Sequence, residues 1–154
     1  MRLKNNIFDI IINVICLIQL VGIVVYLIIT WSSLPDQIPG HFGADGTVTR
    51  WDGKGTLLVM PIFAWVSFCG ITIIERFPQI WNTGVRVTEE NKIRVYRVIK
   101  SLLGALKIIL VTAFVLLTVI QSLALNLPDL YLPVIGTLLF GAIIVSMIRL
   151  VRAR

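Results

Sequence analysis

The sequence predicts an all-α membrane protein, a bundle of four membrane-spanning helices with both ends in the cytoplasm (N-in, C-in). Of the 154 residues, 57% are hydrophobic and only 14% are charged, whereas a soluble domain carries about 25% charged residues. The mean hydropathy is +0.93, and four apolar runs approach or exceed the roughly 20 residues that a membrane helix needs. Four such helices use roughly half of the chain, so we expect a single membrane domain over residues 1–154.

The four apolar runs set the expected spans. They cover about residues 7–31, 57–75, 102–125 and 130–150. The first run follows Arg2 and Lys4, as a secretory signal would, but it is longer than the roughly 7–15 apolar residues of a signal peptide. Tyr26 and Trp31 lie where an interfacial aromatic belt would place them. We therefore expect this run to be retained as a span.

The distribution of Lys and Arg predicts the orientation, because cytoplasmic connections carry an excess of these residues. The inner connection, residues 76–101, holds six of them, and both chain ends are basic. The short connection after the third span holds none, and the two in the outer loop, residues 32–56, are offset by three aspartates. The net charge of +6 thus reflects membrane orientation, and no nucleic-acid partner is expected.

The inner connection is expected to end in an amphipathic helix that continues into the third span. Thr88 is the expected N-cap, with Glu89 and Glu90 at the positive end of the helix. Basic and apolar side chains then alternate as in a helix at the inner membrane surface. The ligand of this basic inner helix could be a protein or anionic lipid, with lipid as the default. Lys107, just inside the third span, is expected to snorkel to the headgroups.

Few polar side chains lie inside the expected spans. Asp9 is expected to be solvated at the inner surface, and Asn13 to make an interhelical hydrogen bond. Glu75 marks the inner end of the second span, and Gln121 and Ser122 are expected to face the outer loop. No ionisable residue is expected at mid-span, which weakens a pump or transporter function.

The outer loop is the most informative segment. Its prolines and glycines favour an extended entry and turns, and Ala44-Asp45-Gly46 predicts a short hairpin. A loop of this length without helical periodicity is usually functional or disordered. The candidate recognition residues are Pro35, Pro39, His41, Phe42, Asp45, Gly46, Arg50 and Trp51.

The residues of this loop favour architecture or recognition over catalysis. His41 is the only histidine, and with Asp45 and Asp52 it could form an acid–base or metal site. Zinc sites need three or four ligands with several His or Cys among them, so no metal or other cofactor is expected, and His41 is expected to hydrogen-bond within the loop. The alternative is a membrane-embedded enzyme or transport subunit that uses these three side chains at the outer surface.

Two patches on opposite sides of the expected membrane carry a resemblance. The outer patch is Leu34-Pro-Asp-Gln-Ile-Pro39, His41-Phe-Gly-Ala-Asp-Gly46 and Arg50-Trp51. The inner patch contributes the candidate residues Asn82, Thr88, Glu89, Glu90, Asn91, Tyr96 and Arg97. Over about residues 30–107 the chain resembles a small bacterial membrane-protein family of unknown function, whose domain is shared with SdpI-type immunity and signalling proteins. Gly40 and Gly84 depart from it, since we expect a larger residue and a proline there.

The resemblance implies a non-enzymatic, multi-pass protein of the bacterial cytoplasmic membrane. SdpI-type proteins confer immunity to a secreted toxic peptide and transmit a signal by holding a repressor at the membrane. We therefore expect peptide-toxin immunity or envelope sensing through the outer loop. The expected partners are the lipid bilayer, an extracellular peptide and a cytoplasmic regulator.

Overall fold

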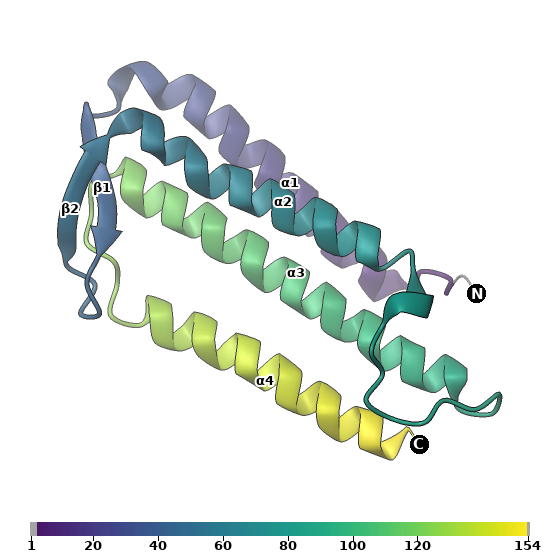
Figure 1. The fold of residues 1–154 in the computed structure, drawn as a ribbon. Helices are drawn as coiled ribbons and strands as arrows, with labels where there is room; N and C mark the ends of the chain where they lie inside the picture. Colours follow the sequence, from purple (N-terminus) through teal and green to yellow (C-terminus); the bar gives the residue numbers. More distant parts are fainter. Residues whose placement is uncertain (1–2, 154) are drawn as a thin grey trace.

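The computed structural model describes residues 3–153 and consists mainly of four long helices (Figure 1). These are α1 (Ile7–Thr30), α2 (Val59–Ile74), α3 (Lys92–Ser122) and α4 (Tyr131–Arg152). Short 3-10 turns extend α1 to Ser33 and begin the second span at Lys54. Within the described residues, four helices are long and apolar enough to cross a membrane. The predicted four-helix membrane fold is confirmed.

Both ends of the described chain lie at one end of the bundle (Figure 1). We call this end the basic end; it comprises the start of α1, residues 75–91, the start of α3 and the end of α4. The segment between α1 and α2 lies at the opposite end, which we call the hairpin end. This arrangement is what an N-in, C-in protein requires, and the cytoplasmic position of the basic end stays a prediction.

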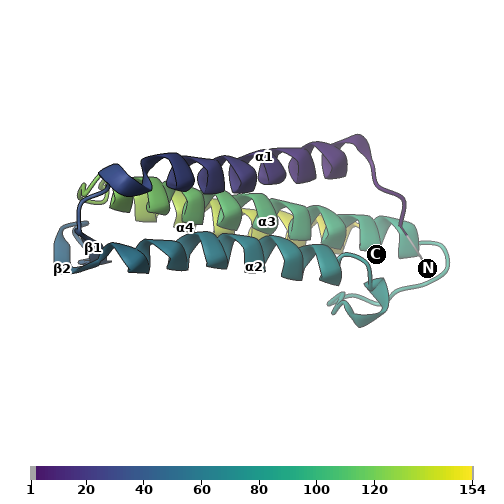
Figure 2. The ribbon, with the colours of Figure 1, turned by 90° about the horizontal axis from the view of Figure 1, so that it is seen from above.

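The central helix of the bundle is α3. It lies between α1 and α2 (Figure 2) and also packs against α4, whereas α4 has no comparable contact with α1 or α2. A core at mid-bundle joins Cys16 and Leu20 of α1 to Ala64 of α2 and Val111 of α3, all fully buried. Cys16 and Cys69 are free thiols, and Cys16 fills the core as a small hydrophobic residue.

The helix starts follow from capping, and one differs from its prediction. Asn6 and Asp9 form a capping box at the start of α1, each side chain accepting the other's backbone N–H. Thr88 is not the side-chain N-cap that we predicted, because α3 begins at Lys92. Instead, Asn91 Oδ1 accepts the Thr88 N–H at 2.8 Å. From Lys92 onward, α3 runs uninterrupted through the predicted inner helix into the third span, as expected.

The third span ends earlier than predicted. We expected it to reach Leu125, but α3 ends at Ser122. Ala124 adopts a left-handed backbone with φ 53°, a conformation that commonly terminates helices. The connection to α4 is therefore longer than the short connection that the predicted spans leave, and it reaches the hairpin.

The outer loop folds into a two-stranded antiparallel sheet that lies across the hairpin end (Figure 1). Its strands are β1 (Gln37–Phe42) and β2 (Val48–Gly53). The chain reverses at the predicted turn, where Gly46 has φ 77°, a conformation that favours glycine. The all-α prediction thus lacked a small sheet, although the turn signal for it was present.

Gly40 explains one departure from the family resemblance. The strand pairing shifts register beside it. A Cβ at this position would lie 2.0 Å from Asp52 Oδ2, so a larger residue would displace that carboxylate. Gly84, where we expected proline, has φ 63°, which the proline ring forbids.

Candidate functional site

The hairpin is hydrogen-bonded to the end of α3 and to the α3–α4 connection. Gln121 Nε2 donates to Pro39 O at 2.8 Å in a buried bond, as the sequence predicted. Leu127 N–H donates to Gly46 O at 2.9 Å. Ser122 was also expected to face the hairpin, but it instead forms a hydrogen bond of 2.9 Å with the hydroxyl of Tyr26 in α1. Both hairpin acceptors are backbone carbonyls, so these bonds fix the position of the strands themselves.

An apolar cluster supports the hairpin from beneath. Ile38 of β1 is fully buried against Leu27, Leu34 and Leu57. Leu27 comes from the end of α1, Leu34 from the segment that enters the hairpin, and Leu57 from the start of the second span. Together with the two hydrogen bonds to backbone carbonyls, the cluster makes the hairpin a fixed cap on the bundle.

The predicted recognition residues divide between the two sides of this cap. Pro35, His41, Asp45, Arg50 and Trp51 are exposed, Phe42 is partly buried, and Pro39 and Gly46 are buried. The exposed fraction of Trp51 is 48%, and Arg50 Nη2 lies 2.9 Å from Asp52 Oδ2. Trp and Arg are enriched at binding hot spots, so β2 displays side chains suited to a partner.

The three side chains of the alternative catalytic site each have a partner within the hairpin. His41 Nδ1 lies 2.6 Å from Thr49 Oγ1, so His41 hydrogen-bonds the loop to itself, as predicted. Asp52 pairs with the arginine of β2, and Asp45 accepts the Thr47 hydroxyl at 2.8 Å. Among residues 3–153, no group of three or more His, Cys, Asp or Glu side chains is arranged to hold a metal ion.

Asp45 stabilises the turn of the hairpin through Thr47. The Thr47 hydroxyl and its backbone N–H both donate to Asp45 Oδ1. These bonds favour the carboxylate and hold the pKa of Asp45 below its ordinary value of 3.8, the hydroxyl contributing most. Because the folded-state pKa is the lower one, this stabilisation is complete above the ordinary value and is lost as pH falls through the lowered pKa.

Thr47→Val is expected to raise the pKa of Asp45 toward its ordinary value, because it removes the hydroxyl donor. The measurement is an NMR titration of the Asp45 carboxyl carbon in lipid nanodiscs. Thr56→Val is the matched control, since the Thr56 hydroxyl donates to Gly53 O instead. An Asp45 pKa that is the same in wild type and Thr47→Val would contradict the role of this bond.

A cleft of about 460 Å³ opens between the hairpin turn and the start of α4. Its walls are Ala44, Asp45, Gly46, Leu127, Pro128, Asp129, Leu132 and Pro133. The two charged residues in this lining are both aspartates, and the rest of the lining is apolar. Asp129 is exposed and forms no ion pair with the described residues. Such a cleft complements a ligand that is both cationic and apolar.

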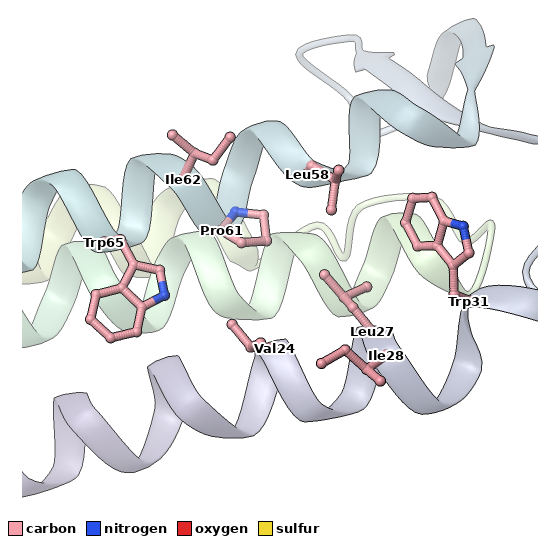
Figure 3. Close-up of a pocket in the computed structure, with 8 residues that line it drawn as sticks. All are labelled: Val24, Leu27, Ile28, Trp31, Leu58, Pro61, Ile62 and Trp65. Atoms are coloured by element: carbon pink, nitrogen blue, oxygen red, sulfur yellow. The ribbon is translucent and has the colours of Figure 1, made fainter.

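A wholly apolar groove lies between the hairpin-end halves of α1 and α2 (Figure 3). Its volume is about 430 Å³, and Trp31 and Trp65 stand at its two ends. Ile28 and Ile62 on its rim are 72% and 59% exposed, and in a membrane they face acyl chains. The groove therefore continues the lipid-facing surface, unlike the cleft beside the hairpin turn.

A buried ion pair joins α2 to α3, and the prediction that Lys107 snorkels to the headgroups is wrong. Lys107 is fully buried. Its Nζ donates to Glu75 Oε2 at 2.7 Å and to Asn13 Oδ1 at 3.0 Å, which confirms the interhelical role of Asn13. Glu75 is the C-cap of α2, so this pair lies toward the basic end of the spans and not at their middle. The side chain turns inward because its partners lie there.

Asp9 is partly buried and ion-paired rather than solvated as predicted. Its side chain is 11% exposed, and Oδ2 lies 3.0 Å from Arg97 Nη1 and 3.3 Å from Lys100 Nζ. These ion pairs tie the start of α1 to α3. The sequence signal that we missed is the spacing of positions 97, 100 and 107, which places three cations on one face of a helix.

The inner patch folds the α2–α3 connection onto the basic end. Asn91 is 4% exposed, and its amide donates to Arg86 O at 3.1 Å. Tyr96 contacts the Trp81 ring edge-on, with 5.9 Å between ring centroids. The candidates Asn82, Thr88, Asn91, Tyr96 and Arg97 make contacts within the fold, Glu89 pairs with a lysine, and Glu90 is exposed.

Comparison with known proteins identifies the hairpin end. Residues 17–64 match the family model of a domain of unknown function, DUF1648. This segment of the chain is similar to the DUF1648 family. This match supports the resemblance of the outer patch to a membrane family of unknown function, and the link to SdpI-type proteins stays a prediction. An uncharacterized protein of Archaeoglobus fulgidus is 32% identical over 77 residues, which cover 45% of this chain and 42% of that protein. No solved structure matches the chain.

The segment that matches DUF1648 lies at one end of the bundle. It comprises the second half of α1, the whole hairpin and the start of α2. The matched segment therefore contains the exposed side chains of β2, one wall of the acidic cleft and nearly all of the apolar groove. Lys107 and the inner patch lie outside the matched segment. The relative is archaeal, so the bacterial source stays a prediction.

Proposed function

We propose that the protein is a non-enzymatic receptor or immunity protein that binds a cationic, apolar extracellular peptide at the hairpin end. The observation that carries the proposal is the cleft between the hairpin turn and α4, whose only charged lining residues are Asp45 and Asp129. Membrane-active peptides commonly combine cationic and apolar side chains, which match these two features. Binding there would neutralise such a peptide or report its presence.

The rigidity of the cleft supports binding. Gly46 and Leu127 both line the cleft and are joined by a hydrogen bond of 2.9 Å. The two walls are therefore held at a fixed separation before a ligand arrives. A preorganised site binds more tightly because little ordering is needed on association.

The length of α3 supports a signal to the opposite side. Gln121 contacts the hairpin at one end of this helix, and Arg97 pairs with Asp9 near the other. At about 1.5 Å per residue, a helix of 31 residues extends roughly 46 Å. We propose that binding at the hairpin end shifts the basic end, where a cytoplasmic regulator would engage.

Asp129→Asn is expected to weaken binding of a synthetic cationic amphipathic peptide about two- to fivefold, because an exposed charge contributes up to about 1 kcal/mol. Binding is measured with purified protein in nanodiscs, at low and at high salt. Asp36→Asn is the matched control: it removes the same charge at the same end of the bundle, but outside the cleft. Salt is expected to reduce the difference between the two variants.

A second test asks whether the protein protects cells from such peptides. Deleting the gene is expected to sensitise cells to at least one member of a panel of membrane-active peptides, and the wild-type gene and His41→Ala are both expected to restore resistance. Unchanged sensitivity across the panel, or equal peptide binding by the Asp129 and Asp36 variants, would reject the proposal. Loss of protection in His41→Ala without loss of binding would favour the enzymatic alternative.

A further inference from the structure

A second cleft lies at the basic end, between the start of α3 and the end of α4. These helix ends are at the opposite end of the bundle from the hairpin (Figure 1). Its volume is about 290 Å³. Four arginines line it, together with one serine and two apolar residues: Arg94, Arg97, Val98, Ser101, Arg149, Arg152 and Ala153. The lining contains no acidic residue.

Most of this positive charge is unneutralised. Arg97 pairs with Asp9 at 3.0 Å. Arg94, Arg149 and Arg152 are exposed and form no ion pair with a side chain of residues 3–153. Like charges gathered around one cleft repel one another and create a positive potential that attracts an anion. Arginine forks bind phosphate oxygens in bidentate fashion.

The surroundings of the cleft distinguish a lipid from a soluble anion. Arg152 also lines a second, shallow groove on α4 with Met147, Ile148 and Val151. These three apolar side chains are 61%, 47% and 55% exposed. A molecule whose phosphate lies in the arginine cleft would place an acyl chain along this groove, because the two surfaces meet at Arg152.

We propose that the cleft between α3 and α4 binds the phosphate headgroup of an anionic phospholipid from the leaflet around the basic end. The arginines of both helices hold the phosphate, and the apolar groove of α4 receives an acyl chain. Because α3 is the helix against which α4 mainly packs, the lipid adds a further bridge between these two helices. The site is independent of the peptide cleft at the hairpin end.

The test compares lipid retention by the full chain, measured by native mass spectrometry after release from nanodiscs of phosphatidylglycerol and phosphatidylcholine in equal amounts. Wild type is expected to retain phosphatidylglycerol preferentially. Arg94→Gln/Arg149→Gln, with one substitution in each wall, is expected to weaken that preference by roughly 25-fold, the product of about fivefold for each arginine. The charge-matched control Arg76→Gln/Arg86→Gln alters the same end outside this cleft and is expected to keep the preference.

The outcomes separate the sources of phosphate. Preference lost in the cleft variant and kept in the control supports the site. Equal loss in both variants would reject it in favour of diffuse surface charge, and no preference in wild type would also reject it. Thermal stabilisation by millimolar inorganic phosphate that equals the effect of phosphatidylglycerol would overturn the assignment to lipid. Failure of the cleft variant to fold is detected by α-helical circular dichroism, and Arg149→Lys, which keeps charge but loses the fork, then gives the deciding retention measurement.

Discussion

Lys107→Met is expected to destabilise the bundle by about 3–5 kcal/mol, the cost of removing one partner from a buried ion pair. The substitution leaves Glu75, whose side chain is 12% exposed, without its cation. It also removes the donor to Asn13, so one side chain on each neighbouring helix loses its partner. The measurement is the free energy of unfolding in mixed micelles, followed by the loss of α-helical circular dichroism.

The double variant Lys107→Met/Glu75→Leu is expected to recover much of this loss, because apolar residues replace a buried pair at little net cost. Recovery measures the coupling between the two sites directly. Lys54→Met is the control, since its partner Asp36 is 97% exposed and such a pair contributes less than about 1 kcal/mol. Equal stability of the Lys107 and Lys54 variants would show that Lys107 reaches water, as its sequence position alone predicts.

The sequence was sufficient for the fold class because membrane helices have a local signal. An apolar run of the right length must be satisfied internally as a helix, so the four spans could be predicted without knowledge of their packing. The orientation of Lys107 could not be predicted in this way. A lysine near the end of an apolar run snorkels if it faces lipid, and its facing depends on Asn13 and Glu75, which are remote in sequence.

At the hairpin end, too, local features could be predicted from the sequence and contacts between remote segments could not. The turn at Asp45-Gly46 was predictable because residue types with left-handed preferences mark it locally. Gln121 was predictable because it lies at the outer end of an apolar run. The acidic cleft was not, because one wall comes from residues 44–46 and the other from residues 127–133, and only the folded chain brings them together.

Gly46→Ala is expected to detach the hairpin turn from the α3–α4 connection and to open the acidic cleft. Gly46 has φ 77°, and a Cβ there would lie 2.4 Å from Leu127 O. This oxygen belongs to the backbone and cannot rotate away, so the connection must move. A left-handed alanine alone costs about 1–2 kcal/mol, and the lost hydrogen bond adds about 1 kcal/mol. Hydrogen exchange of the Leu127 amide, which donates to Gly46 O, measures the detachment.

Substitutions at two other glycines separate the effect of backbone strain from the effect of steric collision. Gly84→Ala has the strain without the clash, since its φ is 63° and nothing lies within 4 Å of an added Cβ; Gly53→Ala has neither. We therefore expect the order Gly46, Gly84, Gly53 in destabilisation, with faster exchange at Leu127 in the first variant alone. If Gly46→Ala also loses the cationic peptide while Gly84→Ala keeps it, the fixed separation of the cleft walls is what the peptide requires. Slow exchange at Leu127 in Gly46→Ala would instead show that the connection follows the hairpin, and the two walls would then move as one unit.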